Sequence, residues 1–158
     1  MTALTSIQPS APANPEPVRF CSRCAAVSSE PARRVCDGCE AGLLLTCRSD
    51  ALPGAAFVIC TYELSVTAVS EAAESILGTQ EELLGTHLLD LATCPLGDDQ
   101  LARHAALAAQ RAREPVELPM RLRSDRGEAL GMLAARVTTC GPPRAALVSV
   151  EPTGFGRR

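Results

Sequence analysis

The chain has 158 residues, of which 46% are hydrophobic, and this composition excludes a wholly disordered protein. Its length suits one well-packed core together with a small accessory module. The net charge of −3 and the pI of about 5.4 exclude a general affinity for nucleic acid or for anionic membranes.

The pattern of apolar residues gives no sign of a membrane or secretory segment. No apolar run approaches the roughly 18–20 residues of a membrane helix, and the first residues lack the basic start and apolar core of a signal peptide. We therefore expect a cytoplasmic protein whose 8 cysteines are metal ligands or free thiols in a reducing compartment. All 15 basic residues are arginine, which together with abundant alanine, glycine and proline suggests a bacterium with a GC-rich genome.

Composition divides the chain into four regions. Residues 1–17 contain four prolines among small and polar residues, which predicts a flexible leader. Residues 18–50 carry paired cysteines, and residues 53–152 show strand and helix patterns in turn. Residues 153–158 are predicted to be an unstructured tail.

The paired cysteines have the spacing of a metal site. Two residues separate Cys21 from Cys24 and also Cys36 from Cys39, and eleven residues lie between the two pairs. This spacing lets both thiolates of a tight turn face one point, and two such turns supply the four sulfurs that zinc binds tetrahedrally. Four protein ligands leave no position for water or substrate, so we predict one structural zinc ion in a small zinc-ribbon module. Iron, or reduced or disulfide-linked cysteines without a metal, are the alternatives.

Other residues near this motif are assigned supporting roles. Four arginines close in sequence are expected to offset the negative charge of zinc with four thiolates, and they are Arg23, Arg33, Arg34 and Arg48. The remaining cysteines occur singly, and a single cysteine is usually a small hydrophobic residue. These single cysteines are Cys47, Cys60, Cys94 and Cys140.

Residues 53–152 predict a mixed fold. Ser70 and Thr79 are expected to cap two short helices that end at Gly78 and Gly85, and an apolar stripe that starts at Leu101 predicts a longer helix. The predicted strands cover residues 56–62, 66–69, 116–122, 130–139 and 145–150, with turns at 125–127 and 141–143. The predicted helices cover residues 71–77, 79–84 and 98–113. This order indicates an α+β fold with a five-stranded antiparallel sheet.

Two motifs in this region carry a resemblance to a known family. Ser70-Glu-Ala-Ala-Glu-Ser-Ile-Leu-Gly78 follows two strands, and Leu83-Leu-Gly85 follows a charged helix. With the later helix and three strands, this order resembles a PAS domain over residues 53–152. The resemblance implies a five-stranded PAS sheet with short helices on one face. It also implies a sensory or dimerisation module that holds a small molecule or binds another protein.

The resemblance allows cofactors to be weighed by position. In the light-sensing flavin subgroup, a reactive cysteine lies three residues after the glycine of the Leu-x-Gly motif, where this chain has Leu88, and Cys94 is too far along. In haem-containing members, the proximal ligand is a histidine on the longer helix, and His104 is the candidate for that role. His87 is interpreted as structural. An apolar ligand, or none, is the other alternative, because few aromatic residues are available to stack a flavin or a base.

Several functions remain open. The first is a non-enzymatic bacterial sensory or regulatory protein, in which the zinc ribbon contacts a partner in signal transduction or transcription regulation. The second is a ribbon-based regulator that binds nucleic acid or RNA polymerase, although five arginines against four acidic residues in 18–52 argue against direct nucleic-acid binding. A haem-based gas or redox sensor is the third. A thiol oxidoreductase is disfavoured by the two symmetric cysteine pairs, so no enzyme activity is expected.

The last two predicted strands are expected to form a contact surface. Residues 130–137 and 145–150 are apolar on both faces over much of their length. Two adjacent strands of this kind expose an apolar patch unless something covers it. We expect a homodimer through the PAS domain, since soluble oligomers are mostly two-fold symmetric. The alternative is that the ribbon folds back over the same face.

Overall fold

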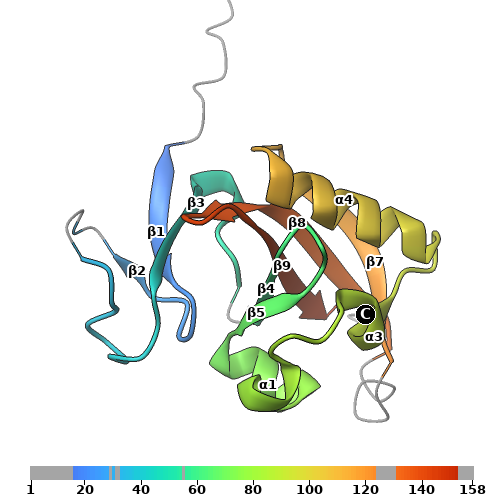
Figure 1. Cartoon of the computed structure of the whole chain (residues 1–158), viewed down its shortest axis with the longest axis horizontal. Coiled ribbons are helices and arrows are strands. Elements are labelled where there is room, and N and C mark those ends of the chain that lie inside the picture. Colours follow the sequence, from blue (N-terminus) through green and yellow to red (C-terminus); the bar gives the residue numbers. More distant parts are fainter. Residues whose placement is uncertain (1–15, 29, 31–32, 55, 124–130, 153–158) are drawn as a thin grey trace, which may run out of the picture.

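The computed structural model describes residues 16–28, 30, 33–54, 56–123 and 131–152. The predicted tail, the turn at 125–127 and most of the leader lie outside these ranges. Figure 1 shows a strongly curved sheet with the longest helix lying across it. The strands are β1 (Pro17–Cys21), β2 (Val27–Ser28), β3 (Leu44–Arg48), β4 (Phe57–Cys60), β5 (Val66–Val69), β6 (Ala92–Thr93), β7 (Val116–Leu122), β8 (Leu133–Gly141) and β9 (Ala145–Pro152). The helices are η1 (Ser49–Ala51), α1 (Glu71–Leu77), α2 (Gln80–Leu83), α3 (Leu88–Leu91) and α4 (Asp98–Gln110).

All strands belong to one antiparallel sheet organised around β8. The order is β2-β1-β3-β8-β9-β4-β5, with β7 beside β8 and β6 beside β7. Strand β9 pairs with β8 along residues 133–140 and so occupies one edge of β8. The other edge is shared, because β7 pairs with residues 133–137 and β3 pairs with residues 140–141. In the described part of the chain, no helix is long and apolar enough to span a membrane.

The α+β class is confirmed, but the predicted five-stranded sheet is wrong. The predicted strands are present as β4, β5, β7, β8 and β9, and the sheet has nine strands in all. The cysteine segment does not form the separate zinc-ribbon module that was expected, since its strands join the same sheet. Strand β3 pairs Thr46 with Gly141 and Cys47 with Cys140. The physical reason is that β8 extends beyond β7, and β3 satisfies the backbone groups that β7 leaves unpaired.

The predicted caps of the short helices are confirmed. The Ser70 hydroxyl accepts the N–H of Ala73 at 3.3 Å, and it also accepts the N–H of Phe57 at 2.9 Å. Thr79 and Glu82 form a reciprocal capping box at the start of α2. Helix α4 ends at Gln110, three residues earlier than expected, because the next residue adopts an extended backbone. Ser70 thus ties the start of α1 directly to β4.

The sheet buries apolar side chains on both faces. On the helix side, Leu101 and Ala105 of α4 are completely buried among side chains of the strands. On the opposite side, Phe57 of β4 meets Phe20 of β1 edge to face, with ring centroids 5.6 Å apart and an interplanar angle of 84°. Both rings are completely buried. The cysteine segment therefore closes a second core on the face that the helices leave open.

This outer core includes part of the apolar surface on which the predicted homodimer was based, namely Ala145 and Leu147 of β9. Its members come from the cysteine segment and from the strands β4, β8 and β9. They are Phe20, Cys47, Phe57, Ile59, Cys140, Ala145 and Leu147. The segment folds back over the sheet, which was the alternative to dimerisation. The dimer itself stays a prediction.

Replacing Phe20 with alanine should destabilise the whole protein and not only its N-terminal part. We expect the zinc-loaded Phe20→Ala variant to lose about 3–5 kcal/mol of unfolding free energy, because a buried aromatic ring is removed from a closed core. Denaturant unfolding followed by circular dichroism measures this loss. Val27→Ala is the control, since Val27 is 59% exposed and should change stability by less than about 0.5 kcal/mol. Coincident curves for Phe20→Ala and the wild type would contradict the role of the outer core.

Candidate metal centre

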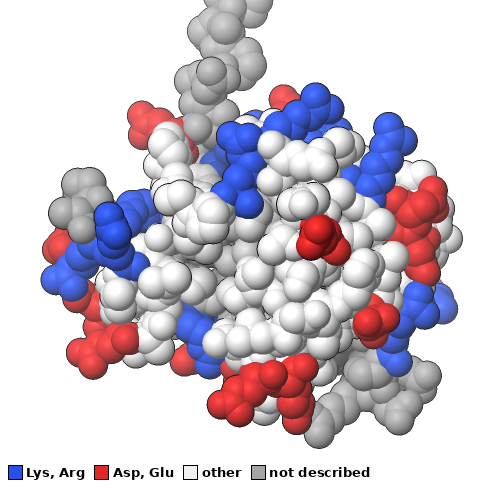
Figure 2. All heavy atoms as spheres, viewed as in Figure 1, with Lys and Arg blue, Asp and Glu red and all other residues white. Residues whose placement is uncertain are grey.

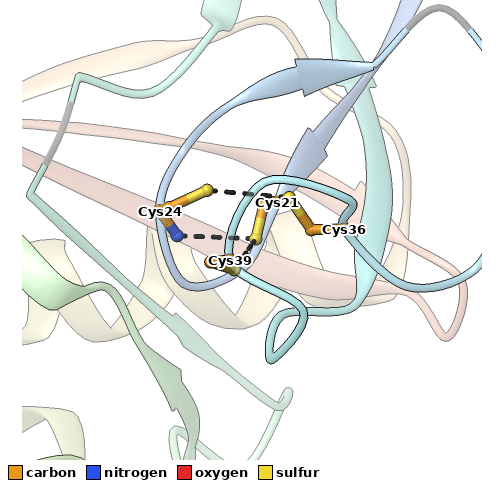
Figure 3. A group of neighbouring side chains, drawn as sticks. All are labelled: Cys21, Cys24, Cys36 and Cys39. Carbon is orange, nitrogen blue, oxygen red and sulfur yellow. Dashed lines mark hydrogen bonds between the residues drawn. The ribbon is translucent and has the colours of Figure 1, made fainter.

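The four predicted cysteines lie together in the structure. Cys21 ends β1, Cys24 lies in the turn that follows, and Cys36 and Cys39 lie in the loop between β2 and β3. Figure 3 shows their side chains pointing toward one another. The four Sγ atoms all lie within 4.8 Å of one another, with 3.5 Å between Cys21 and Cys39 and 3.7 Å between Cys24 and Cys36. Sulfurs on a tetrahedron with Zn–S bonds of about 2.3 Å are separated by about 3.8 Å, so a metal ion such as zinc fits at the centre.

The two cysteine turns have closely similar backbones. In each, the residue after the second cysteine adopts the left-handed conformation, with φ of 65° at Ala25 and 56° at Glu40. The N–H of Ala25 donates to the carbonyl of Cys21 at 3.1 Å, and the N–H of Glu40 donates to the carbonyl of Cys36 at 3.0 Å. Left-handed backbone is unfavourable for residues other than glycine. Because both turns adopt the same unfavourable backbone conformation, we infer that this conformation serves to orient their sulfur atoms.

Backbone amides point at the sulfur atoms and favour the thiolate form. The N–H groups of Arg23 and Cys24 lie 3.3 and 3.4 Å from the Cys21 sulfur, but burial still raises the pKa of Cys21 to about 12. The N–H groups of Ala41 and Gly42 lower the pKa of Cys39 to about 6. Cys39 therefore offers a thiolate at neutral pH. A bound cation would stabilise the other thiolates in the same way, because metal ligation displaces the thiol proton.

Gly42 makes room for the first turn. A Cβ atom at position 42 would lie 2.1 Å from the Cys21 sulfur and 3.0 Å from the backbone nitrogen of Arg23. Gly38 also lies in the second turn, but a Cβ there would meet its nearest neighbour, the Cys36 sulfur, at an ordinary 3.7 Å. Only a glycine at position 42 allows the two turns to approach each other this closely.

The four single cysteines lie apart from this group, as predicted. All four are buried in apolar surroundings. Burial raises the pKa of Cys47 to about 11 and the pKa values of Cys60 and Cys140 to about 12. The thiols of Cys47, Cys60 and Cys140 are therefore protonated at neutral pH, and all four single cysteines serve as small hydrophobic side chains.

Three of the four arginines expected to offset the charge of the centre are engaged elsewhere. Arg33 pairs with Glu30 at 2.6 Å and also with Asp37. Arg48 donates two hydrogen bonds to Asp50, at 2.8 and 2.9 Å. The backbone amides, which the sequence analysis did not consider, face the sulfurs instead.

Arg23 links the first cysteine turn to the helices, a contact that sequence reasoning missed. Its NH1 group donates to the carbonyl of Val69 at 2.7 Å, to Glu74 Oε1 at 2.5 Å and to Gln80 Oε1 at 3.3 Å. Its own carbonyl accepts the N–H of Glu71 at 2.8 Å. One residue between two metal-ligand positions therefore contacts β5, α1 and α2. No local sequence pattern reveals the acceptors of the Arg23 side chain, because they lie 46–57 residues further along the chain.

The two histidines lie outside the cysteine cluster. His87 caps α3 by accepting the N–H of Leu89 at its Nδ1 atom, 3.2 Å away, which is a structural role. His104, the candidate haem ligand, lies partly exposed on α4 next to the buried Ala105. Burial, and then the charges of Arg113 and Arg103, lower the pKa of His104. Haem ligation by His104 stays a prediction.

No protein-family model matches the chain, and no curated protein matches it. Within the described residues, the four cysteines form the one group of three or more potential metal-ligating side chains. All four positions of a tetrahedral ion would be filled by protein sulfur. Such a closed site supports structure and not catalysis at the metal.

The contrast between Gly42 and Gly38 gives a direct test of the centre. We expect purified wild-type protein to contain about one zinc ion per chain. Gly42→Ala should lose most of it, because the added methyl group occupies the space of the Cys21 sulfur. Gly38→Ala should keep it. Metal analysis by mass spectrometry, with titration of released thiols, measures both. Full zinc content in Gly42→Ala would show that the two turns do not close around the metal as described.

Proposed function

We propose that the chain is a non-enzymatic regulatory protein in which one structural zinc ion fastens a cysteine segment to a PAS-like sensory sheet. The observation that carries this proposal is the convergence of four cysteine sulfurs within 4.8 Å on a segment that shares a sheet with the other strands. Zinc is favoured over iron because a closed four-sulfur site needs no redox chemistry to serve structure.

The order of elements after the cysteine segment supports the PAS-like assignment. Two strands, β4 and β5, precede the short helices α1 to α3, and the longer α4 precedes the antiparallel strands β7, β8 and β9. The helix side of this sheet holds the larger buried core. A sensory or partner-binding role is the function that the resemblance implies for such a body.

The Arg23 contacts connect the metal site to the PAS-like sheet and its short helices. The Arg23 side chain is 20% exposed and the Glu74 side chain is 27% exposed, so the pair is partly shielded from water. Because Arg23 stands between two ligands, the metal fixes the backbone from which its side chain reaches α1 and α2. Metal occupancy and the order of these helices are therefore coupled.

The cysteine segment also offers a surface for a partner protein. Val27, Val35 and Leu43 are 59%, 46% and 58% exposed, and Val35 and Leu43 face each other across an isolated bridge. Four of its five arginine side chains, those of Arg19, Arg23, Arg33 and Arg48, donate to carbonyl and carboxylate oxygens of the same chain. Exposed apolar residues and internally paired arginines favour a protein partner over nucleic acid.

Zinc removal should loosen α1 and α2 through Arg23. In hydrogen exchange measured by mass spectrometry, we expect residues 71–83 of the wild type to exchange roughly fivefold faster or more after zinc is removed by a chelator, since charged hydrogen bonds are lost. Zinc-loaded Arg23→Ala should show the same increase while it keeps its zinc. Removing zinc from Arg23→Ala should then add little.

Arg19→Ala is the matched control for this experiment. Arg19 donates to the carbonyls of Glu30, at 2.6 Å, and of Arg33, and among the described residues it forms no hydrogen bond or ion pair with the helices. Its replacement should leave exchange in residues 71–83 unchanged. Exchange in that region that is insensitive to zinc in the wild type would contradict the coupling.

The homodimer through the PAS-like sheet is a separate proposal. Strands β7 and β8 carry an ion pair between Glu117 and Arg136 at 3.1 Å, and neither residue belongs to the outer core that the cysteine segment closes. Sedimentation equilibrium of the full chain tests the dimer, which predicts twice the monomer mass at tens of micromolar. A monomer under these conditions would exclude it.

A further inference from the structure

An open cavity of about 500 Å³ lies where the cysteine segment meets the end of α4. Its walls come from β1, β3, the end of β8, the turn after β8 and the residues that follow α4. Figure 2 shows basic side chains gathered over the end of α4 and the neighbouring strands. The cavity is far larger than one water molecule and lies in the size range of small-molecule sites.

Three arginines, Arg48, Arg113 and Arg144, line this cavity, and two of them carry uncompensated charge. Arg48 is neutralised by its two hydrogen bonds to Asp50. Arg113 and Arg144 form no ion pair within the described part of the chain. The NH1 atom of Arg113 is shielded from solvent and has no hydrogen-bond partner. A shielded guanidinium nitrogen without an acceptor is costly, so Arg113 is held here without a partner for its charge, and an anion at the remaining part of the guanidinium would offset that charge.

The carbonyl groups at the C-terminal end of α4 do not disfavour an anion in this cavity. Helix carbonyls carry partial negative charge at a C-terminus. Here the Thr139 hydroxyl lies 2.7 Å from the carbonyl oxygen of Ala108 and 2.9 Å from that of Arg111. Arg144 donates from NH1 to the carbonyl of Gln110 at 2.9 Å. These contacts satisfy the last carbonyls and leave the other nitrogens of Arg144 for a ligand.

The rest of the lining is mostly apolar. It includes Pro17, Cys47, Ala112 and Pro142. A bare inorganic ion would leave this surface without contacts. An acid group attached to an apolar body would use both the guanidinium groups and the apolar wall.

We propose that this cavity binds a small organic anion whose acid group lies at Arg113 and Arg144 and whose apolar body lies against Pro17, Ala112 and Pro142. None of the four clustered cysteines lines the cavity, so the anion proposal can be tested independently of the zinc proposal. Because β3 forms one wall, a bound anion would also bridge the cysteine segment and the end of α4.

Two fluorescent probes test this site in the zinc-loaded full chain. Anilinonaphthalene sulfonate (ANS) has an acid group on an apolar body, and phenylnaphthylamine is the same fluorophore without the sulfonate. We expect saturable binding of ANS at one site and weaker binding of the uncharged probe. Arg113→Gln should weaken ANS binding by about tenfold, the effect of losing a charge-assisted hydrogen bond, and should leave the uncharged probe unchanged.

Further variants separate the cavity from general surface binding. Arg121→Gln is the control, because Arg121 is exposed on β7 and does not line the cavity. It should bind ANS as the wild type does. Ala112→Tyr, at an exposed position of the lining, should fill the cavity and abolish binding of both probes. ANS affinity that is unchanged in both Arg113→Gln and Arg144→Gln, or unchanged in Ala112→Tyr, would overturn the proposal.

Discussion

Phe20 packs against Phe57 while the neighbouring strand β3 pairs with the last residues of β8, and these two contacts fix the cysteine segment to the sheet. The contact between the two rings lies on the face opposite α4, so the segment closes a second core there. From this attachment, β1 carries the first cysteine turn to the end of β5, where Arg23 reaches the helices. Strand β3 then forms one wall of the cavity beside α4. The metal centre, the helix contact and the cavity thus depend on one docking of the segment.

The cysteine segment has little apolar packing of its own around the metal site. The buried residues there are Cys21, Cys36 and Leu44. A small segment of this kind normally relies on a metal for its shape. Here it has a second support, because Phe20 and Cys47 are buried in the outer core. A metal bound by the four cysteines would therefore shape the turns, while apolar packing holds the strands.

Local sequence patterns predicted the features that depend on interactions between residues close together in the chain. The spacing of the cysteine pairs predicted a cluster that is found, and the caps at Ser70 and Thr79 follow from hydrogen bonds within three residues. The nine-stranded sheet was missed, because the pairing of Cys47 with Cys140 joins residues 93 positions apart and leaves no periodic trace. The charge-balancing role of Arg23 was also misjudged, since its acceptors lie in later elements. The PAS resemblance, haem ligation by His104 and the dimer stay predictions, because a fold does not by itself imply a function.

A bound metal and apolar packing would support different parts of the cysteine segment, and this difference determines which parts change when the metal is lost. Left-handed backbone at Ala25 and Glu40 costs about 1–2 kcal/mol each, whereas zinc binding to small structural sites contributes roughly 10–16 kcal/mol. A zinc ion bound there would therefore outweigh the strain of both turns several times over, and without it the turns would be the first parts to relax. The contact between Phe20 and Phe57 does not involve the metal, so β1 and β3 keep their places on the sheet. Loss of the metal then acts at the Cys21–Cys24 turn, and the nearest consequence is at the contacts of Arg23 with α1 and not in the sheet.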